Sequence, residues 1–151
     1  AALLAMGARW LASRDADTRV AAGWLAAQLS LGADVVCGTV GVDDWSCRGN
    51  EGSSLREDFN ANYRDADGHS HVHGANLGVS ASAYRCSGGF RHLQCREDQQ
   101  LVDALVACGA RVAWSAKPRV LTSARRDVRV HGGFGSHLNA LALRTRQAGR
   151  G

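Results

Sequence analysis

The stretch RWLASRDADT, residues 9–18, begins the strand–helix–strand unit from which the fold is predicted. Its mostly apolar first half, residues 9–13, is typical of a short buried strand, and the acidic loop that follows leads to Thr18, a residue that can cap a helix. The predicted helix ends at Gly32, and the valine-rich run DVVCGTVGV, residues 34–42, indicates a second buried strand. A strand, a helix and a second strand in this order are typical of an α/β unit.

The predicted helix has an apolar face that we expect to point inward, formed by Val20, Trp24, Leu25 and Leu29. The same periodicities predict a weak helix near 53–66, a strand at 71–80, a helical turn at 81–84, a helix at 97–108, extended runs at 110–115 and 119–123, and a helix at 134–147. Strands and helices alternate, which predicts an α/β fold with a mostly parallel sheet flanked by helices. Ligands of such sheets bind beyond the carboxyl ends of the strands, where the Asp15-Ala16-Asp17 loop is expected to lie.

The chain has 151 residues, of which 45% are hydrophobic and 21% charged, so we expect a single domain over residues 1–151. No apolar stretch approaches the roughly 18 residues that a membrane-spanning helix needs, and the opening AALLAMGARW lacks the order of a secretory signal. Five cysteines without a C-x-x-C pair argue against a disulfide framework and a zinc ribbon, and Cys37 and Cys108 are expected to be core thiols. These features predict a soluble cytoplasmic protein, with peripheral membrane association as an alternative.

The net charge of +4 comes largely from arginines in the last third of the chain. A basic stretch can bind nucleic acid, but these arginines are not interleaved with aromatic residues that could stack on bases. We therefore expect no nucleic-acid partner. A solvated surface is the favoured interpretation, and attraction of a diphosphate substrate is a further one.

Two pairs of carboxylates are candidates for chemistry. Asp15 and Asp17, two apart after a buried strand, can converge on a hard divalent cation, although an isolated D-x-D is also typical of a helix cap beside a solvated carboxylate. Glu97 and Asp98 begin a predicted helix, where the helix dipole favours negative charge and where a carboxylate could also act as a general base. Taken alone, each pair is better explained by a structural role at the start of a helix than by metal binding or catalysis.

Three further groups of polar residues are weaker candidates. Gly74-Ala75-Asn76 inside a predicted strand would allow close approach to the backbone beside a side chain that can donate and accept. Histidines at 69, 71 and 73 would share one strand face, and without cysteine pairs they indicate a polar strand edge rather than a zinc site. Ser123 and Arg125 could grip phosphate or be exposed.

The order of these segments is more specific than any one of them. A strand-terminal DADT is followed by an apolar strand ending in G-x-V, by GANLGVS-x-x-AY, by a GGF loop, by an ED-headed helix, and by TSAR with a later GGF. This order resembles the family-2 glycosyltransferases of the GT-A fold, from about Trp10 to Leu141. The resemblance implies a Rossmann-like nucleotide-diphospho-sugar transferase fold with a mostly parallel sheet.

The resemblance also implies roles for individual residues. Asp15 and Asp17 would hold Mg²⁺ or Mn²⁺ against the diphosphate of a sugar nucleotide, and Asp98 would be the catalytic base with Glu97 as its neighbour. The other matching positions are Gly74, Ala75 and Asn76 in the donor-sugar pocket, Gly88 and Gly89 before the acceptor site, Ser123 and Arg125 in a T-S-x-R stretch of unassigned role, and His131 or His137 as a third metal ligand.

The implied reaction is an inverting hexosyl-type transfer from a nucleotide-diphosphate sugar to an acceptor hydroxyl whose identity the sequence does not specify. Asp98 would take the proton from that hydroxyl while a metal ion neutralises charge on the leaving diphosphate. Two features depart from the family: Arg14 replaces a small polar residue before D-x-D, and the first strands, which bind the nucleotide base, would have to precede Ala1. The chain is therefore expected to be an N-terminally truncated, partial glycosyltransferase domain. The alternative is a non-catalytic remnant that acts as a binding or interaction domain.

Overall fold

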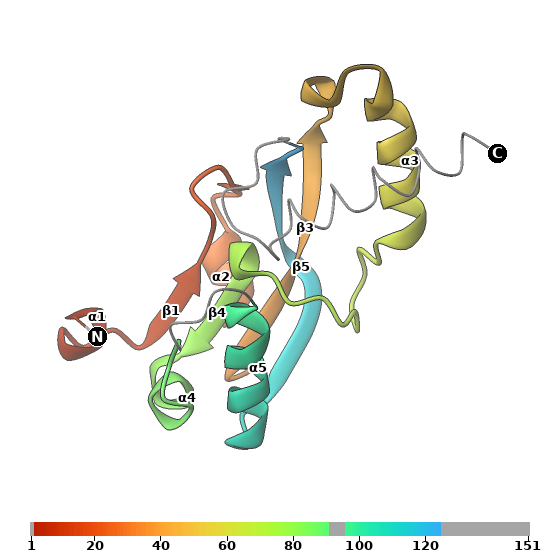
Figure 1. The fold of residues 1–151 in the computed structure, drawn as a ribbon. Coiled ribbons are helices and arrows are strands. Elements are labelled where there is room, and N and C mark those ends of the chain that lie inside the picture. The colour runs from red at the N-terminus through yellow and green to blue at the C-terminus, as the bar shows by residue number, and fades with distance from the viewer. Residues whose placement is uncertain (1, 91–95, 125–151) are drawn as a thin grey trace.

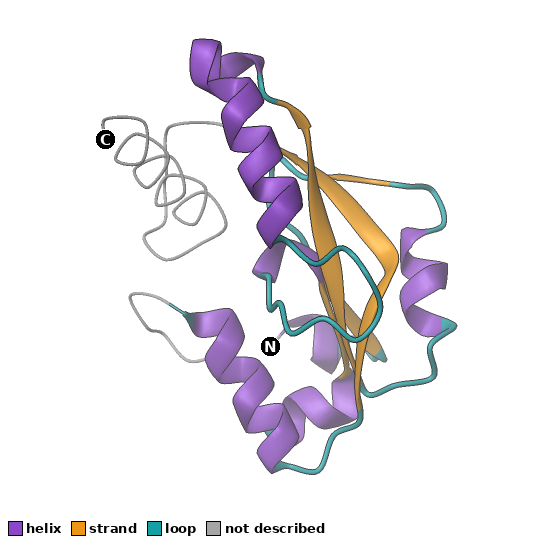
Figure 2. Cartoon of the chain, turned by 90° about the vertical axis from the view of Figure 1, so that its right-hand side faces the viewer, coloured by secondary structure: helices purple, strands orange, loops and turns teal. Residues whose placement is uncertain are grey.

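A five-stranded sheet runs through the computed structural model of the chain, which describes residues 2–90 and 96–124 (Figure 1). The strands are β1 (Trp10–Ser13), β2 (Arg19–Val20), β3 (Val35–Asp44), β4 (Leu77–Ser80) and β5 (Val112–Ser123). The α-helices are α1 (Ala2–Ala5), α2 (Trp24–Leu29), α3 (Gly52–Asn62), α4 (Ala81–Cys86) and α5 (Glu97–Ala107), and two 3₁₀ helices span Ser46–Glu51 and Gly74–Asn76. In Figure 2, α3 and α5 lie on one side of the sheet and α2 on the other.

The prediction of a mostly parallel, GT-A-type sheet is wrong. The strand order is β1-β4-β3-β5-β2, and the only parallel pairing within the described residues is that of β3 with β5; β4 runs antiparallel to both β1 and β3, and β2 runs antiparallel to β5. The sheet is mixed and curled. Alternation of strands and helices predicts which elements form but not which become neighbours: β1 and β3 point the same way, and β4 inserts between them in the opposite direction.

The valine-rich strand predicted at 34–42 is confirmed and forms the centre of the sheet. Val35, Val36, Cys37 and Val40 are fully buried, because β3 has neighbours on both edges and is covered on both faces. Helix α5 covers one face: its three buried side chains pack with those of β3 and β4 in one cluster, made of Val35, Cys37, Leu77, Val79, Leu101, Val102 and Leu105. Burial of each valine or leucine side chain in this cluster contributes about 1.5–3 kcal/mol to stability. The core therefore fixes α5 against the sheet.

Helix α2 faces the sheet with polar atoms as well as apolar ones. It begins at Trp24, and the expected inward residues Leu25 and Leu29 are 47% and 51% exposed. Trp24 points inward as predicted, and Gln28 does so as well: Gln28 Oε1 accepts a 2.9 Å hydrogen bond from the indole of Trp10, and Trp24 donates to Asn76. The predicted apolar face is wrong at Leu25 and Leu29, because hydrogen bonds of Trp24 and Gln28, which hydropathy does not reveal, set the rotation of the helix.

Several element predictions also need correction. The strand predicted at 71–80 is reduced to β4, since residues 74–76 form a 3₁₀ turn. The two extended runs around Pro118 are one strand, β5, whose register against β3 shifts nearby. Such an irregularity accommodates a residue without an N–H group. Cys37 is a core thiol as predicted, whereas Cys108 is exposed, and the helix predicted at 134–147 lies outside the described residues. Among the described helices, none is long and apolar enough to cross a bilayer.

Candidate functional site

The acidic loop lies directly after β1, as the sequence predicts. Its backbone forms a turn in which the N–H of Thr18 donates to the carbonyl of Asp15 at 3.1 Å. The guanidinium of Arg14 donates to the carbonyls of Asp15 and Thr18 at 3.4 and 3.1 Å, so this side chain bridges the two ends of the turn. Thr18 does not cap a helix: the chain continues into β2, and the buried Thr18 hydroxyl has no hydrogen-bond partner among the described residues.

The loop carboxylates share their electrostatic environment with the start of α5. Burial raises the pKa of Asp15, and the nearby negative charges of Asp17 and Asp98 raise it further, in that order. Asp98 is far from Asp15 in the sequence, yet its charge acts on the same carboxyl group. The acidic loop and the start of α5 therefore lie near enough for their charges to interact.

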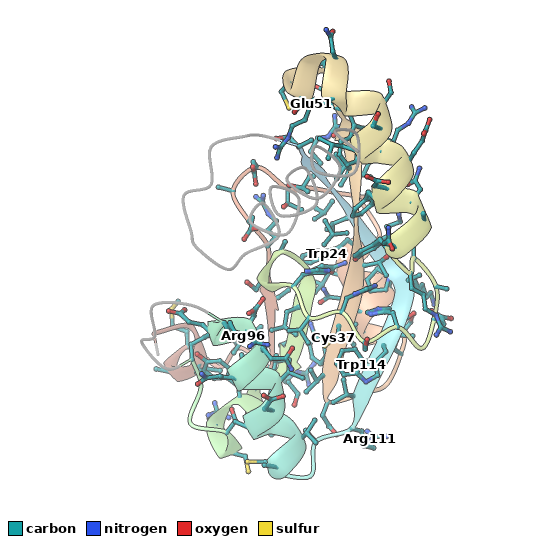
Figure 3. The ribbon with its side chains drawn as sticks, turned by 45° about the vertical axis from the view of Figure 1, so that its right-hand side comes forward. Trp24, Cys37, Glu51, Arg96, Arg111 and Trp114 are labelled. Carbon is teal, nitrogen blue, oxygen red and sulfur yellow. The ribbon has the colours of Figure 1, made fainter. Side chains whose placement is uncertain are left out.

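Asp98 is held at the first turn of α5 by two backbone hydrogen bonds. Its Oδ2 accepts from the N–H of Gly74 at 3.0 Å, and its Oδ1 accepts from the N–H of Gln99 at 2.9 Å. The side chain is half-buried, while Glu97 beside it is exposed. Arg96, which precedes the helix, adopts a left-handed conformation with φ of 60°, unusual for a residue with a side chain. Figure 3 shows Arg96 at the start of this helix.

The Gly74-Ala75-Asn76 segment lies beside Asp98, but its parts have different surroundings. Gly74 is the member in contact with Asp98, whereas Ala75 is buried in a second core cluster with Val40 and Val120. The Asn76 side chain is fully buried: its Oδ1 accepts from the Trp24 indole at 2.9 Å, and its Nδ2 donates to the carbonyl of Thr39 at 2.8 Å and to that of Pro118. The amide of Asn76 thus connects α2, β3 and β5 beneath the site.

The glycine-rich loop follows α4. Gly88 and Gly89 have φ of 77° and 73°, which only glycine adopts readily, and Gly89 packs on the ring of Tyr84. A shallow hollow of about 210 Å³ lies between this loop and α5, lined by Gly89, Gln100, Leu101, Asp103 and Ala104. The loop and the Asp98-bearing helix are therefore adjacent.

The remaining predicted site residues lie elsewhere or are not described. Ser123 ends β5 in register with Asp44, and its hydroxyl is buried without a hydrogen-bond partner among the described residues. Arg125, His131 and His137 lie outside the described residues. The three histidines do not line a strand: the rings of His71 and His73 stack on Tyr63, with centroids 4.2 and 5.8 Å away, and His69 stacks on His71 at 5.4 Å.

The acidic loop could hold a divalent cation only if substrate phosphates and water supply the remaining ligands. Within residues 2–90 and 96–124, no three His, Cys, Asp or Glu side chains are arranged as a metal-binding group. Mg²⁺ needs no such cage, because it is commonly bound by one or two carboxylates together with substrate phosphates and water. Asp15 and Asp17 supply hard oxygen ligands of this kind. Burial raises the pKa of Asp15 most, and the negative charges of Asp17 and Asp98, which a cation would neutralise, raise it further.

Two residues of this region have no motif in the sequence to mark them. Trp24 is connected to the Gly74-Ala75-Asn76 segment by its hydrogen bond to Asn76. Cys37 is fully buried, near enough to Asp98 for its charge to act on the thiol. Both residues are labelled in Figure 3. Burial raises the pKa of Cys37 to about 12, with a further contribution from the charge of Asp98. Cys37 is therefore a neutral core thiol rather than a nucleophile.

Comparison with known proteins gives no assignment, since no protein-family model and no curated protein matches this chain.

Proposed function

We propose that this chain is the metal- and acceptor-binding part of a glycosyltransferase that uses a nucleotide-diphosphate sugar and inverts the anomeric carbon. The observation that supports the proposal is the meeting of three separate sequence motifs: Asp98 accepts a hydrogen bond from Gly74, and its charge acts on Asp15. The proposal concerns chemistry and does not depend on a parallel sheet, because function resides in a site rather than in a fold.

Asp98 is suited to accept a proton from an acceptor hydroxyl. Each of its carboxylate oxygens accepts one backbone hydrogen bond and keeps a second lone pair, so the group is oriented but not saturated. A positioned base of this kind usually contributes about 10²–10⁴-fold to a rate.

Asp15 and Asp17 would hold Mg²⁺ or Mn²⁺, which when bound supplies Lewis-acid assistance to the departure of the nucleoside diphosphate. The protein's own part is to keep both carboxylates on one short turn, and Arg14 bridges that turn through two backbone carbonyls. The two acidic sites would thus divide the reaction: the loop binds the donor diphosphate, and Asp98 acts on the acceptor.

Calorimetry tests this division of roles. MnCl₂ is titrated into the full chain with and without UDP, GDP or dTDP. We expect metal-dependent binding of at least one nucleoside diphosphate, lost in Asp15→Asn and kept in Asp98→Asn. Glu57→Gln, which removes an exposed carboxylate from α3, is the matched control and should bind like the wild type. Absence of nucleotide binding in the folded wild-type chain would favour a non-catalytic interaction domain.

A further inference from the structure

Two exposed thiols lie where the neighbouring helices α4 and α5 end. Cys86 is the last residue of α4, and Cys108 follows the last residue of α5; both are free and exposed. The two helices are in contact, with α4 beside the lower end of α5 in Figure 1.

Helical spacing explains why these two thiols meet. Cys86 lies three residues after Ala83, which packs against the core cluster to which α5 contributes Leu105, and Cys108 lies three residues after Leu105. Residues three apart share a face of a helix, so the packing between the helices extends towards their ends. There Cys86 lies close enough to Cys108 to be the main cause that raises the pKa of its thiol.

We propose that Cys86 and Cys108 form a reversible intramolecular disulfide, so that this end of α4 and α5 is a redox modification site. The oxidant is a small-molecule disulfide of the glutathione type. One cysteine thiolate attacks a sulfur of that disulfide and releases one small thiol; the second cysteine thiolate then attacks the mixed disulfide and releases the other. The two cysteine thiols are oxidised, one small disulfide is reduced to two thiols, and an excess of dithiol reverses the exchange.

The bond would close a loop that contains both the glycine-rich loop and Asp98. A cross-link of this kind stabilises a protein mainly by restricting its unfolded chain. The midpoint of thermal unfolding should therefore be higher for the oxidised protein than for the reduced one, and dithiothreitol should restore the lower value.

The experiment maps the disulfide in the full chain. The folded protein is incubated with oxidised glutathione, free thiols are blocked with iodoacetamide in denaturant, and tryptic peptides are analysed by mass spectrometry. Trypsin separates the relevant cysteines, since Cys86 falls in residues 86–91, Cys95 in 92–96 and Cys108 in 97–111. We expect a cross-linked pair of peptides 86–91 and 97–111, absent in Cys86→Ser and unchanged in Cys47→Ser.

Three results in folded wild-type protein would each overturn the proposal: both cysteines remain free thiols, each carries its own glutathione, or either one pairs with Cys47 or Cys95. The peptide map of the wild type decides among these results even if a serine variant fails to fold.

Discussion

The backbone N–H of Gly74 donates a 3.0 Å hydrogen bond to Oδ2 of Asp98, which joins the segment before β4 to the first turn of α5. The other oxygen of the same carboxylate accepts from the N–H of Gln99 at 2.9 Å. Asp98 is therefore a structural link as well as the candidate base, and its two roles can be separated by experiment.

Asp98→Asn should destabilise the fold by about 1–2 kcal/mol, because an amide has one acceptor oxygen and cannot accept both backbone hydrogen bonds. Urea unfolding followed by circular dichroism measures the change. Glu57→Gln, at an exposed position on α3, should stay within about 0.5 kcal/mol of the wild type. Equal stability of Asp98→Asn and the wild type would show that the bond to Gly74 does not contribute in solution.

Asp15→Asn should stabilise the metal-free protein at neutral pH by at most about 1 kcal/mol, since solvent screens the charge of this exposed carboxylate. The pKa of Asp15 is raised by burial and by the charges of Asp17 and Asp98, so its ionised form opposes folding. Because the folded state binds this proton more readily than the unfolded state, the Asp15 contribution to stability becomes more favourable as pH falls through the raised pKa. Below the pKa that Asp15 has in the unfolded chain, this contribution to stability changes no further.

The measurement is the difference in unfolding free energy between Asp15→Asn and the wild type, from neutral pH down to pH 4, without metal. The advantage of the variant should shrink as pH falls. A variant that is less stable than the wild type at neutral pH would mean that Asp15 makes favourable contacts that outweigh its charge.

Arg14→Gln should weaken the binding of Mn²⁺ in the presence of nucleoside diphosphate by about 10-fold, the lower end of the effect of residues that orient metal ligands. The reason is that Arg14 bridges the carbonyls of Asp15 and Thr18 and so fixes the turn that carries both carboxylates. Calorimetric titration measures the affinity, and thermal unfolding should change little because the side chain is exposed. Unchanged affinity would mean that the turn holds its shape without this bridge.

Gly38→Ala should destabilise the protein by about 1–3 kcal/mol through overpacking. A methyl group at Gly38 would collide with the amide of Asn76, which is fixed by its bonds to Trp24, Thr39 and Pro118. Gly23→Ala is the matched control, because no heavy atom lies within 4 Å of the added carbon and φ is −88°. Similar urea midpoints for the two variants would contradict the fixed position of Asn76.

The elements that the sequence predicted well are those whose signal is local. The valine run of β3 and the periodic apolar residues of α5 specify their own structure, and the helix predicted at 97–108 is found at 97–107. Strand direction is set by distant neighbours: nothing in LGVS at 77–80 indicates that this strand lies between β1 and β3 and runs against both. The parallel sheet was therefore the wrong inference from a correct order of elements.

In the site, too, the local patterns were predictable and the contacts between distant residues were not. Asp15 was expected at the end of a strand, where the structure places it, and Asp98 was expected at the start of a helix. The burial of Asn76 was not predictable, because its partners come from α2, β3 and β5 and leave no local pattern. Polar partners also explain the error in α2, where hydropathy favoured Leu25 and Leu29 over the hydrogen-bonded Gln28.

The most direct test of the central claim is the rate at which Asp98→Asn transfers sugar. Release of nucleoside diphosphate from a panel of nucleotide-diphosphate sugars is measured with Mn²⁺ and a mixture of hydroxyl acceptors, for wild type, Asp98→Asn and Glu57→Gln. We predict acceptor-dependent release by the wild type and by Glu57→Gln, and a loss of about 10²–10⁴-fold in Asp98→Asn with nucleotide binding retained. A folded Asp98→Asn protein that releases nucleoside diphosphate at the wild-type rate would contradict the assignment of Asp98 as the base.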